Sequence, residues 1–222
     1  EKVYRFGSTM VQCIRHGLLL AILLSMACSS HESDQTILAE SDFAWDVDGW
    51  HVDGEGRDVA HMSKMIKSGD SGAETWHFVA PQKFVGAKRE AYGGLLSFRH
   101  GFFEFNSEGK DTLPGFDVII SSEAHSLAIG RRGIFPAWAF SSDHKLELHE
   151  SAGWLLTDSN QPPSRPEMLR LLSKISSIKI RGGIYAGSED AYIMDVRLLA
   201  GAQHSSLVQR SSLKTQSIHT DL

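Results

Sequence analysis

The chain has 222 residues with a formal net charge of -5, and 41% of its residues are hydrophobic and 22% charged. This length suits one good-sized domain with tails, and the composition is typical of a globular protein and argues against a disordered one. An acidic balance disfavours a nucleic-acid partner, because phosphate binding needs a clustered positive face. The two short basic segments, 131–133 and 181–183, each contain glycine and are predicted to be turns.

Residues 1–28 are predicted to be a secretory signal peptide, with Met10 as a candidate start. Arg15 and His16 precede an apolar run over residues 17–24, and small residues follow it. A charged head, a short apolar stretch and small residues are typical of export signals. The run is shorter than the roughly 20 apolar residues of a membrane-spanning helix. A buried core helix is the alternative.

The chain has two cysteines, Cys13 and Cys28. Cleavage near Cys28 leaves the folded region without cysteine, which excludes a disulfide, a cysteine zinc site and a cysteine nucleophile there. The segment from Leu23 to Cys28 resembles the lipid-attachment box of bacterial lipoproteins, so Cys28 is a predicted lipid-attachment site. Release of a soluble protein by an ordinary signal peptidase is the alternative.

Three segments with different patterns follow the signal. Residues 29–42 are polar and acidic and are predicted to be a linker. Residues 43–202 contain short apolar runs separated by turn residues and are predicted to form one domain. Residues 203–222 are serine-rich and aperiodic and are predicted to be a disordered tail.

Alternation of apolar and polar residues predicts several half-buried strands in residues 43–202. In the last of them, Tyr192, Met194, Val196 and Leu198 alternate with polar or second-face residues. Many short alternating strands in one domain predict an all-β fold, a jelly-roll β-sandwich. The residues expected to share one core are Leu96, Phe98, Phe102, Phe116, Val118, Leu146, Leu148, Ile178, Ile180 and Val196.

One segment has helical periodicity. Ser164 and Glu167 form a capping box around Pro166, which predicts a helix over 166–175. Its apolar positions recur at i, i+3, i+4 and i+7, so one stripe should pack on the outside of the sandwich. These positions are Met168, Leu171, Leu172 and Ile175.

Sequence motifs for catalysis are weak. Residues 69–72, Gly-Asp-Ser-Gly, match the nucleophile motif of trypsin-like proteases, but no segment supplies the histidine base, and a solvated turn is expected. The loop 46–49 suggests calcium, but Arg57 stands where an EF-hand needs glutamate. The eleven histidines form no His-Glu-x-x-His motif, so a catalytic zinc site has no support.

Carboxylates and tryptophans leave two alternatives open. Glu104, Glu123, Glu147 and Glu150 could supply a glycosidase pair, although acids on strand faces are usually solvated. Trp138 and Trp154, together with Trp76, are candidates for stacking on a sugar ligand, and core packing is the alternative for each.

Six segments, in order, resemble the laminin B (laminin IV type A) domain family. The segment 76–86, Trp-His-Phe-Val-Ala-Pro-Gln-Lys-Phe-Val-Gly, is similar to a family strand that enters Ala-Pro and then Lys-Phe-aliphatic-Gly. Next, 91–98, Ala-Tyr-Gly-Gly-Leu-Leu-Ser-Phe, is similar to its Tyr-Gly-Gly step into a strand. The other four similar segments are 43–50, 145–154, 166–182 and 192–198.

The resemblance covers about 160 residues and implies a jelly-roll sandwich of the galactose-binding type without catalytic residues. It implies a non-enzymatic extracellular or cell-surface module for binding or adhesion, whose partner is an extracellular protein or a glycan. The alternative is a carbohydrate-binding module of a surface glycan-handling system; an enzyme is the least favoured class. Laminins carry Cys-rich EGF-like repeats beside this domain, and the 222 residues contain none. We therefore expect a free-standing exported protein, with membrane contact only through an N-terminal lipid.

No cofactor is expected apart from a structural calcium ion. Jelly rolls resembling this one often hold calcium where the first and last strands meet, which implies Asp195 as a ligand, with Glu40 or Asp42 as partners. An Asp195 side chain that faces solvent is the alternative.

Overall fold

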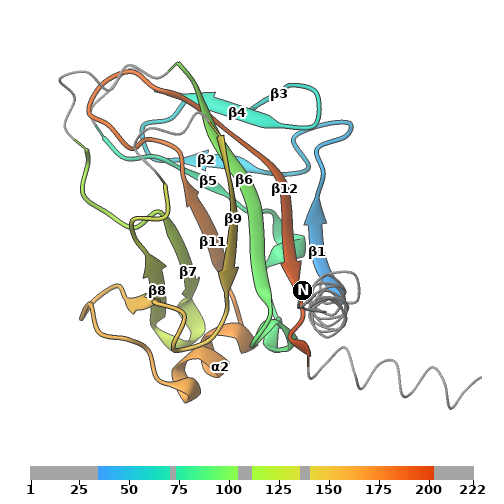
Figure 1. Cartoon of the computed structure of the whole chain (residues 1–222), viewed down its shortest axis with the longest axis vertical. Coiled ribbons are helices and arrows are strands. Elements are labelled where there is room, and N and C mark those ends of the chain that lie inside the picture. Colours follow the sequence, from blue (N-terminus) through green and yellow to red (C-terminus); the bar gives the residue numbers. More distant parts are fainter. Residues whose placement is uncertain (1–34, 71–73, 105–111, 136–140, 203–222) are drawn as a thin grey trace, which may run out of the picture. The chain divides into compact units, whose positions relative to one another are not determined.

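The computed structural model describes residues 35–70, 74–104, 112–135 and 141–202, and every structural statement concerns these residues. Two antiparallel sheets pack face to face around one hydrophobic core (Figure 1). The predicted jelly-roll β-sandwich is therefore confirmed. Within the described residues, no helix is long and apolar enough to cross a membrane.

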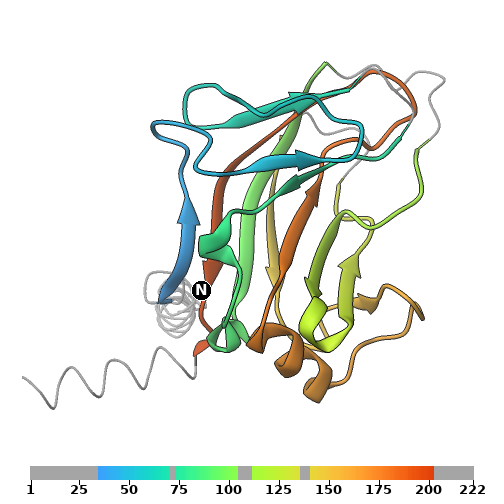
Figure 2. The same cartoon turned by 180° about the vertical axis from the view of Figure 1, so that it is seen from behind.

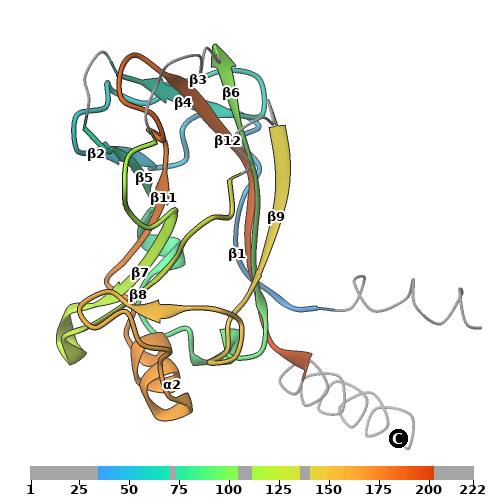
Figure 3. The same ribbon diagram turned by 60° about the vertical axis from the view of Figure 1, so that its left-hand side comes forward.

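The first sheet is built around two long central strands, β12 (Asp190–Leu199) and β6 (Leu95–Glu104). On one edge β9 (Ser141–Glu147) pairs with β6. On the other edge two strands share β12: β4 (Ile66–Gly69) pairs with its first half and β1 (Ile37–Ser41) with its second half. The short β3 (Ala60–His61) pairs with β4. Figure 3 shows this sheet from its edge.

The second sheet has its longest pairings at β7 (Val118–Ser122), between β8 (Leu127–Arg131) and β11 (Ser177–Arg181). Beyond β8 lies β10 (Leu155–Leu156). Beyond β11 lie β5 (His77–Val79) and β2 (His51–Asp53). Three short 3-10 helices connect strands: η1 (Gln82–Phe84), η2 (Arg89–Ala91) and η3 (Glu123–His125).

The predicted core is confirmed, with one residue set apart. All ten predicted side chains are buried, and nine of them belong to the continuous core cluster. The tenth, Phe116, packs beside Gly130 at the end of β8, where any side chain at 130 would collide with the Phe116 ring. Phe116 therefore supports the rim of the sandwich rather than its centre.

The helix α2 (Arg165–Ser173) begins at the predicted capping box. The Ser164 hydroxyl accepts a hydrogen bond from the Glu167 backbone N–H, and the Glu167 carboxylate accepts one from the Ser164 N–H. The helix ends before the predicted residue 175, but Ile175 still continues its buried stripe. α2 packs against β7 and β8 at one end of the second sheet (Figure 2).

The alternation expected in the closing strand is wrong over its first half. A register shift between Met194 and Arg197 marks a β-bulge, and Asp195 there has a left-handed φ of 51°. A bulge inserts one extra residue and exchanges the two faces of the strand. Ile193 is therefore buried, and Tyr192 and Met194 turn to the outer face, while the prediction holds for the residues after the bulge.

The predicted domain boundary at residue 43 is also wrong, because β1 lies inside the predicted linker 29–42. β1 pairs with β12, and Ala39 and Ser41 are buried there. Residues 43–50, expected to open the domain as a strand, form turns in which Asp48 and Gly49 have positive φ. The strand was missed because its five residues mix acidic, polar and apolar types without a clear period.

Candidate functional site

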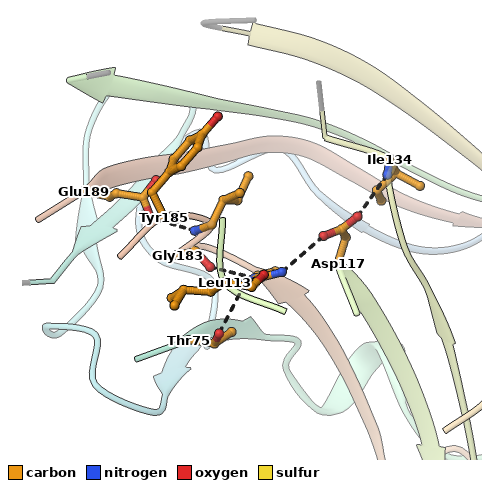
Figure 4. Close-up of polar contacts among 9 residues, drawn as sticks. Thr75, Leu113, Asp117, Ile134, Gly183, Tyr185 and Glu189 are labelled. Carbon is orange, nitrogen blue, oxygen red and sulfur yellow. Dashed lines mark hydrogen bonds and ion pairs between the residues drawn. The ribbon is translucent and has the colours of Figure 1, made fainter. Parts of the chain in front are cut away.

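Arg181 is a buried cation at the end of β11, with 3% of its side chain exposed. Its Nε donates to the Gly183 carbonyl at 2.6 Å. Its Nη2 donates to the Leu113 carbonyl at 2.7 Å and to the Thr75 hydroxyl at 3.3 Å. These bonds fix the plane of the guanidinium and leave Nη1 on the side of Asp117 (Figure 4).

Asp117 is the buried anion opposite Arg181 and lies one residue before β7. Its Oδ1 is 3.6 Å from Nη1 of Arg181, and its Oδ2 accepts a hydrogen bond from the Ile134 N–H at 2.9 Å. Burial raises the pKa of Asp117 and lowers the pKa of Arg181. Both shifts favour the neutral forms, so the loss of hydration outweighs the attraction between the two charges. The surrounding fold, rather than the pair itself, keeps the charges in place.

Backbone hydrogen bonds join the three segments around this pair. The Asp117 N–H donates to the Arg131 carbonyl at 2.7 Å, and the Arg181 N–H donates to the Asp117 carbonyl at 2.8 Å. The Leu113 N–H donates to the Ile184 carbonyl at 2.7 Å. The segments 112–117, 131–135 and 181–185 are therefore held in one rigid arrangement.

Glu189 and Trp76 shape the loop that follows β11. One buried oxygen of Glu189 accepts hydrogen bonds from the N–H groups of Ile184 and Tyr185, at 2.6 and 2.8 Å (Figure 4). Gly182 lies against the Trp76 indole, where an added Cβ would come within 2.1 Å of the ring. Only glycine permits this approach, so Arg181 and the loop after it have a fixed path.

A cavity of about 420 Å³ opens between the three segments. It lies at the end of the second sheet opposite α2, because β11 begins near α2 and ends at Arg181. Its volume is within the usual range of small-molecule sites. The residues that line it are Thr112, Leu113, Pro114, Gly115, Asp117, Arg132, Gly133, Phe135, Arg181 and Ile184.

Arg132 is the exposed charge on the cavity wall. Its guanidinium carbon lies 3.9 Å from the centre of the Phe116 ring, a cation–π contact that orients the side chain. Three charged residues are among the described residues that line the cavity: Arg132 and Arg181 are positive and Asp117 is negative. This described part of the lining therefore has a net charge of one positive unit, although the whole chain is acidic.

Two buried histidines lie behind the cavity. The His100 ring stacks on the cavity residue Phe135, with ring centres 4.0 Å apart, and His144 lies 6.5 Å from His100. Burial lowers the pKa of His100 to about 3 and the pKa of His144 to about 4. Both rings are therefore neutral at physiological pH and pack as aromatic groups.

The structure contains a serine–histidine contact but no catalytic triad among its described residues. Ser142 Oγ lies 2.7 Å from Nε2 of His144. The neighbouring Asp143 carboxylate binds Arg99 at 2.7 Å, so it does not orient the imidazole. With a pKa lowered to about 4, His144 is a weak general base.

The candidate ligand-stacking role of Trp154 is wrong. Trp154 is fully buried, and its Nε1 donates to the Glu147 carbonyl at 2.7 Å, so neither face of the indole can meet a ligand. Trp76 is fully buried as well. Trp138 and the lipid-attachment candidate Cys28 lie outside the described residues.

Two of the candidate carboxylates, Glu147 and Glu150, are separately engaged. Glu147 contacts His149 at 2.7 Å, and Glu150 accepts a hydrogen bond from the Tyr92 hydroxyl at 2.6 Å. Each has a surface partner of its own, as expected for solvated acids on strands and turns. The Gly-Asp-Ser-Gly turn and the Glu104 side chain fall partly or wholly outside the described residues.

The candidate calcium ligands surround a cation that belongs to the chain itself. Glu40 binds Arg197 Nε at 2.7 Å, and Glu40, Asp195 and Asp42 together raise the pKa of Arg197. The Asp195 side chain is exposed on the bulge. In the described part of the chain, no three His, Cys, Asp or Glu side chains are grouped closely enough to hold a metal. The arrangement fits calcium poorly and favours the alternative, an Asp195 that faces solvent.

The Arg181–Asp117 pair was not among the predicted site residues. Alternation in 177–181 assigns Arg181 to the solvent face, and its side-chain partners apart from Gly183 are 64 or more residues away. The sequence signal that could have marked it is the Arg-Gly-Gly run at 181–183, because two glycines after a cation allow close packing around it.

The sequence is similar to the laminin B (domain IV) family and to laminin subunits. The family model for laminin B (domain IV) matches residues 77–213. Laminin subunit gamma-1 of Xenopus tropicalis is 27% identical over 198 residues, and the human subunit is 26% identical over 203. These alignments cover 82% and 86% of this chain but only 12% and 11% of the two relatives.

A solved laminin domain has a similar fold. The L4b domain of human laminin alpha-2 superimposes with a TM-score of 0.55 at 20% identity, over 77% of this chain and 94% of that domain. A family 11 carbohydrate-binding module from Clostridium thermocellum gives a TM-score of 0.43 at 12% identity, over 76% of this chain and 95% of the module. The family model covers more than half of the 222 residues, and its match agrees with the two-sheet fold. The chain belongs to the laminin B (domain IV) family.

Proposed function

We propose that this chain is a non-enzymatic binding and adhesion module that acts outside the cell or at its surface. The observation that carries the proposal is the cavity beside Arg181 and Asp117, whose donor and acceptor are fixed by the fold. A preorganised polar pair in a cavity favours binding because little conformational freedom is lost when a ligand enters. Family membership supports an extracellular-matrix type of module.

The chemistry of the cavity supports binding rather than catalysis. Among the described residues, its lining has no histidine, cysteine or lysine, and the one carboxylate in that lining is held by Arg181 and by the Ile134 N–H. A hydrolase would need a base or nucleophile next to the bound substrate. The Ser142–His144 contact lacks an orienting carboxylate among the described residues.

A glycan is the second candidate ligand, beside an extracellular protein. Sugar hydroxyls both donate and accept hydrogen bonds, so they match a site that offers both functions. Nη1 of Arg181 is a donor and Oδ1 of Asp117 is an acceptor, and they lie 3.6 Å apart on the same cavity wall. One hydroxyl group can bind both.

The test is binding of the full chain to an array of glycans and to a panel of extracellular-matrix proteins. Thr112→Trp, at the exposed rim, should block the cavity and abolish binding; Ser151→Trp, on an exposed turn away from the cavity lining, is the matched control. Absence of binding to every glycan and protein would contradict the function. Equal binding by the two variants would show that the ligand binds outside this cavity. Cleavage of a bound ligand would contradict a non-enzymatic role.

A further inference from the structure

We propose that the cavity beside Arg181 binds a saccharide unit that carries a carboxylate, such as a hexuronic acid. This inference rests on the proposed binding function and names the ligand class of the same site. The Arg181–Asp117 pair would bind hydroxyls, and Arg132 would bind the carboxylate.

The hydroxyl part of the argument starts from the bonds that Arg181 has already made. Nε and both N–H groups of Nη2 are directed to the Gly183 and Leu113 carbonyls and to Thr75. The Nη1 group instead faces Oδ1 of Asp117 across 3.6 Å, which is too long for a good hydrogen bond. A hydroxyl placed between them accepts from Nη1 and donates to Oδ1 at shorter distances.

Apolar lining fits the remaining surface of a sugar ring. Leu113, Pro114, Ile184 and the half-buried Phe135 present carbon surface to the cavity. The C–H faces of a pyranose pack on such surface, while its hydroxyls bind polar groups at the edge. The stack of Phe135 on His100 keeps this wall rigid.

The charge of the described part of the lining favours an acidic ligand. Arg181 and Asp117 balance each other, and Arg132 has no ion-pair partner among the residues that the structure describes. Stacking on Phe116 holds the Arg132 guanidinium at the cavity while its N–H groups stay available. A carboxylate is planar and carries one negative charge, so it matches both the bidentate geometry of arginine and the single excess positive charge.

A multiply charged phosphate fits less well. The Asp117 carboxylate lines the same wall and would repel a dianion more strongly than a single carboxylate. The inference therefore commits to a monoanionic sugar acid, and binding of inorganic phosphate is an outcome that opposes it.

The experiment compares oligosaccharides of galacturonic and glucuronic acid with their methyl esters, which keep the hydroxyls but lack the charge. Calorimetric titration of the full chain should give at least one acid series that binds about tenfold more tightly than its ester, the size of one charge-assisted contact. Arg132→Gln should remove this preference and leave ester binding unchanged. Arg170→Gln, with the same charge change on the exposed face of α2, should keep it.

Several outcomes overturn the inference. Equal binding of acids and esters by the wild type, no binding of either, or an unchanged preference in Arg132→Gln would each do so. Tighter binding of inorganic phosphate than of the sugar acids would assign the site to another anion. If the chain binds a matrix protein on the panel but no saccharide, the proposed function stands and this inference alone fails.

Discussion

At one end of the second sheet, α2 covers the strands with Met168, Leu171 and Leu172, all fully buried. At the other end, the buried side chains that join the segments are Arg181 and Asp117. The apolar end can adapt to small changes, because non-directional contacts hold it together. The polar end depends on fixed geometry, because each charge must keep its partners. The cavity opens at the polar end, where the partners of each charge are fixed.

The largest expected effect comes from breaking the charge pair. Arg181→Met should lower the free energy of unfolding by about 3–5 kcal/mol, because it leaves the Asp117 carboxylate buried without its cation. The double variant Arg181→Met/Asp117→Leu should recover much of this loss, because it removes both charges. Urea unfolding followed by tryptophan fluorescence measures both values. If Arg181→Met is as stable as the wild type, the Asp117 carboxylate is hydrated or protonated without its cation.

The apolar end should lose stability for another reason, a cavity and not an unpaired charge. Leu171→Ala should lower the free energy of unfolding by about 2–5 kcal/mol, because it leaves a cavity under α2. Arg170→Ala, on the exposed side of the same helix, should change it by less than about 0.5 kcal/mol. The same urea titration compares the two. Equal losses in both variants would show that helix propensity, and not burial, stabilises this end.

The pH dependence should come from the three histidines whose pKa is lowered by burial. The pKa of His100 is about 3 in the folded chain, below its ordinary value of 6.5. The unfolded chain therefore binds the proton first as the pH falls. The contribution of His100 to the free energy of unfolding is fully present above pH 6.5. It decreases from there towards pH 3, by up to about 1.4 kcal/mol per pH unit. His144 and His77, each with a pKa lowered to about 4, act in the same direction over a narrower range.

Unfolding at pH 7, 6 and 5 measures this slope. His100→Leu should unfold with a shallower dependence on pH than the wild type, with the exposed His51→Leu as matched control. An unchanged slope in His100→Leu would mean that carboxylates alone set the acid sensitivity. The two ends would then differ in the geometry of their contacts but not in the pH dependence of their stability.

Much of the fold follows from local pattern. The alternation around Phe98 and Ile180 and the capping box at Ser164 each report a local preference, so a single sequence suffices to predict them. The bulge at Asp195 could not be predicted, because nothing within the strand signals the extra residue. Strand β1 was missed because its place depends on a partner about 160 residues away.

The candidate site was less predictable than the fold. Surface-type residues such as Arg181 and Asp117 are assigned to solvent by any periodicity argument, and only long-range contacts bury them. Trp154 illustrates the reverse error: an aromatic residue that suggests ligand stacking in the sequence forms part of the core. Residue type alone does not distinguish a position that faces solvent or a ligand from one that is buried.

The pairing of β1 with β12 has a mechanical consequence. Ile37 pairs with Leu199, and the Ala200 N–H donates to the Thr36 carbonyl at 2.8 Å, so the folded unit begins and ends at the same point. A pulling force applied through the two ends loads this ladder from its open end and separates one hydrogen bond after another, as in a zipper. Antiparallel strands loaded in this way yield at lower force than strands sheared along their length, because their bonds break in turn and not together. In an adhesive protein under tension, β1 would be the first element to detach, while the cavity, at the far end of the other sheet, keeps its shape.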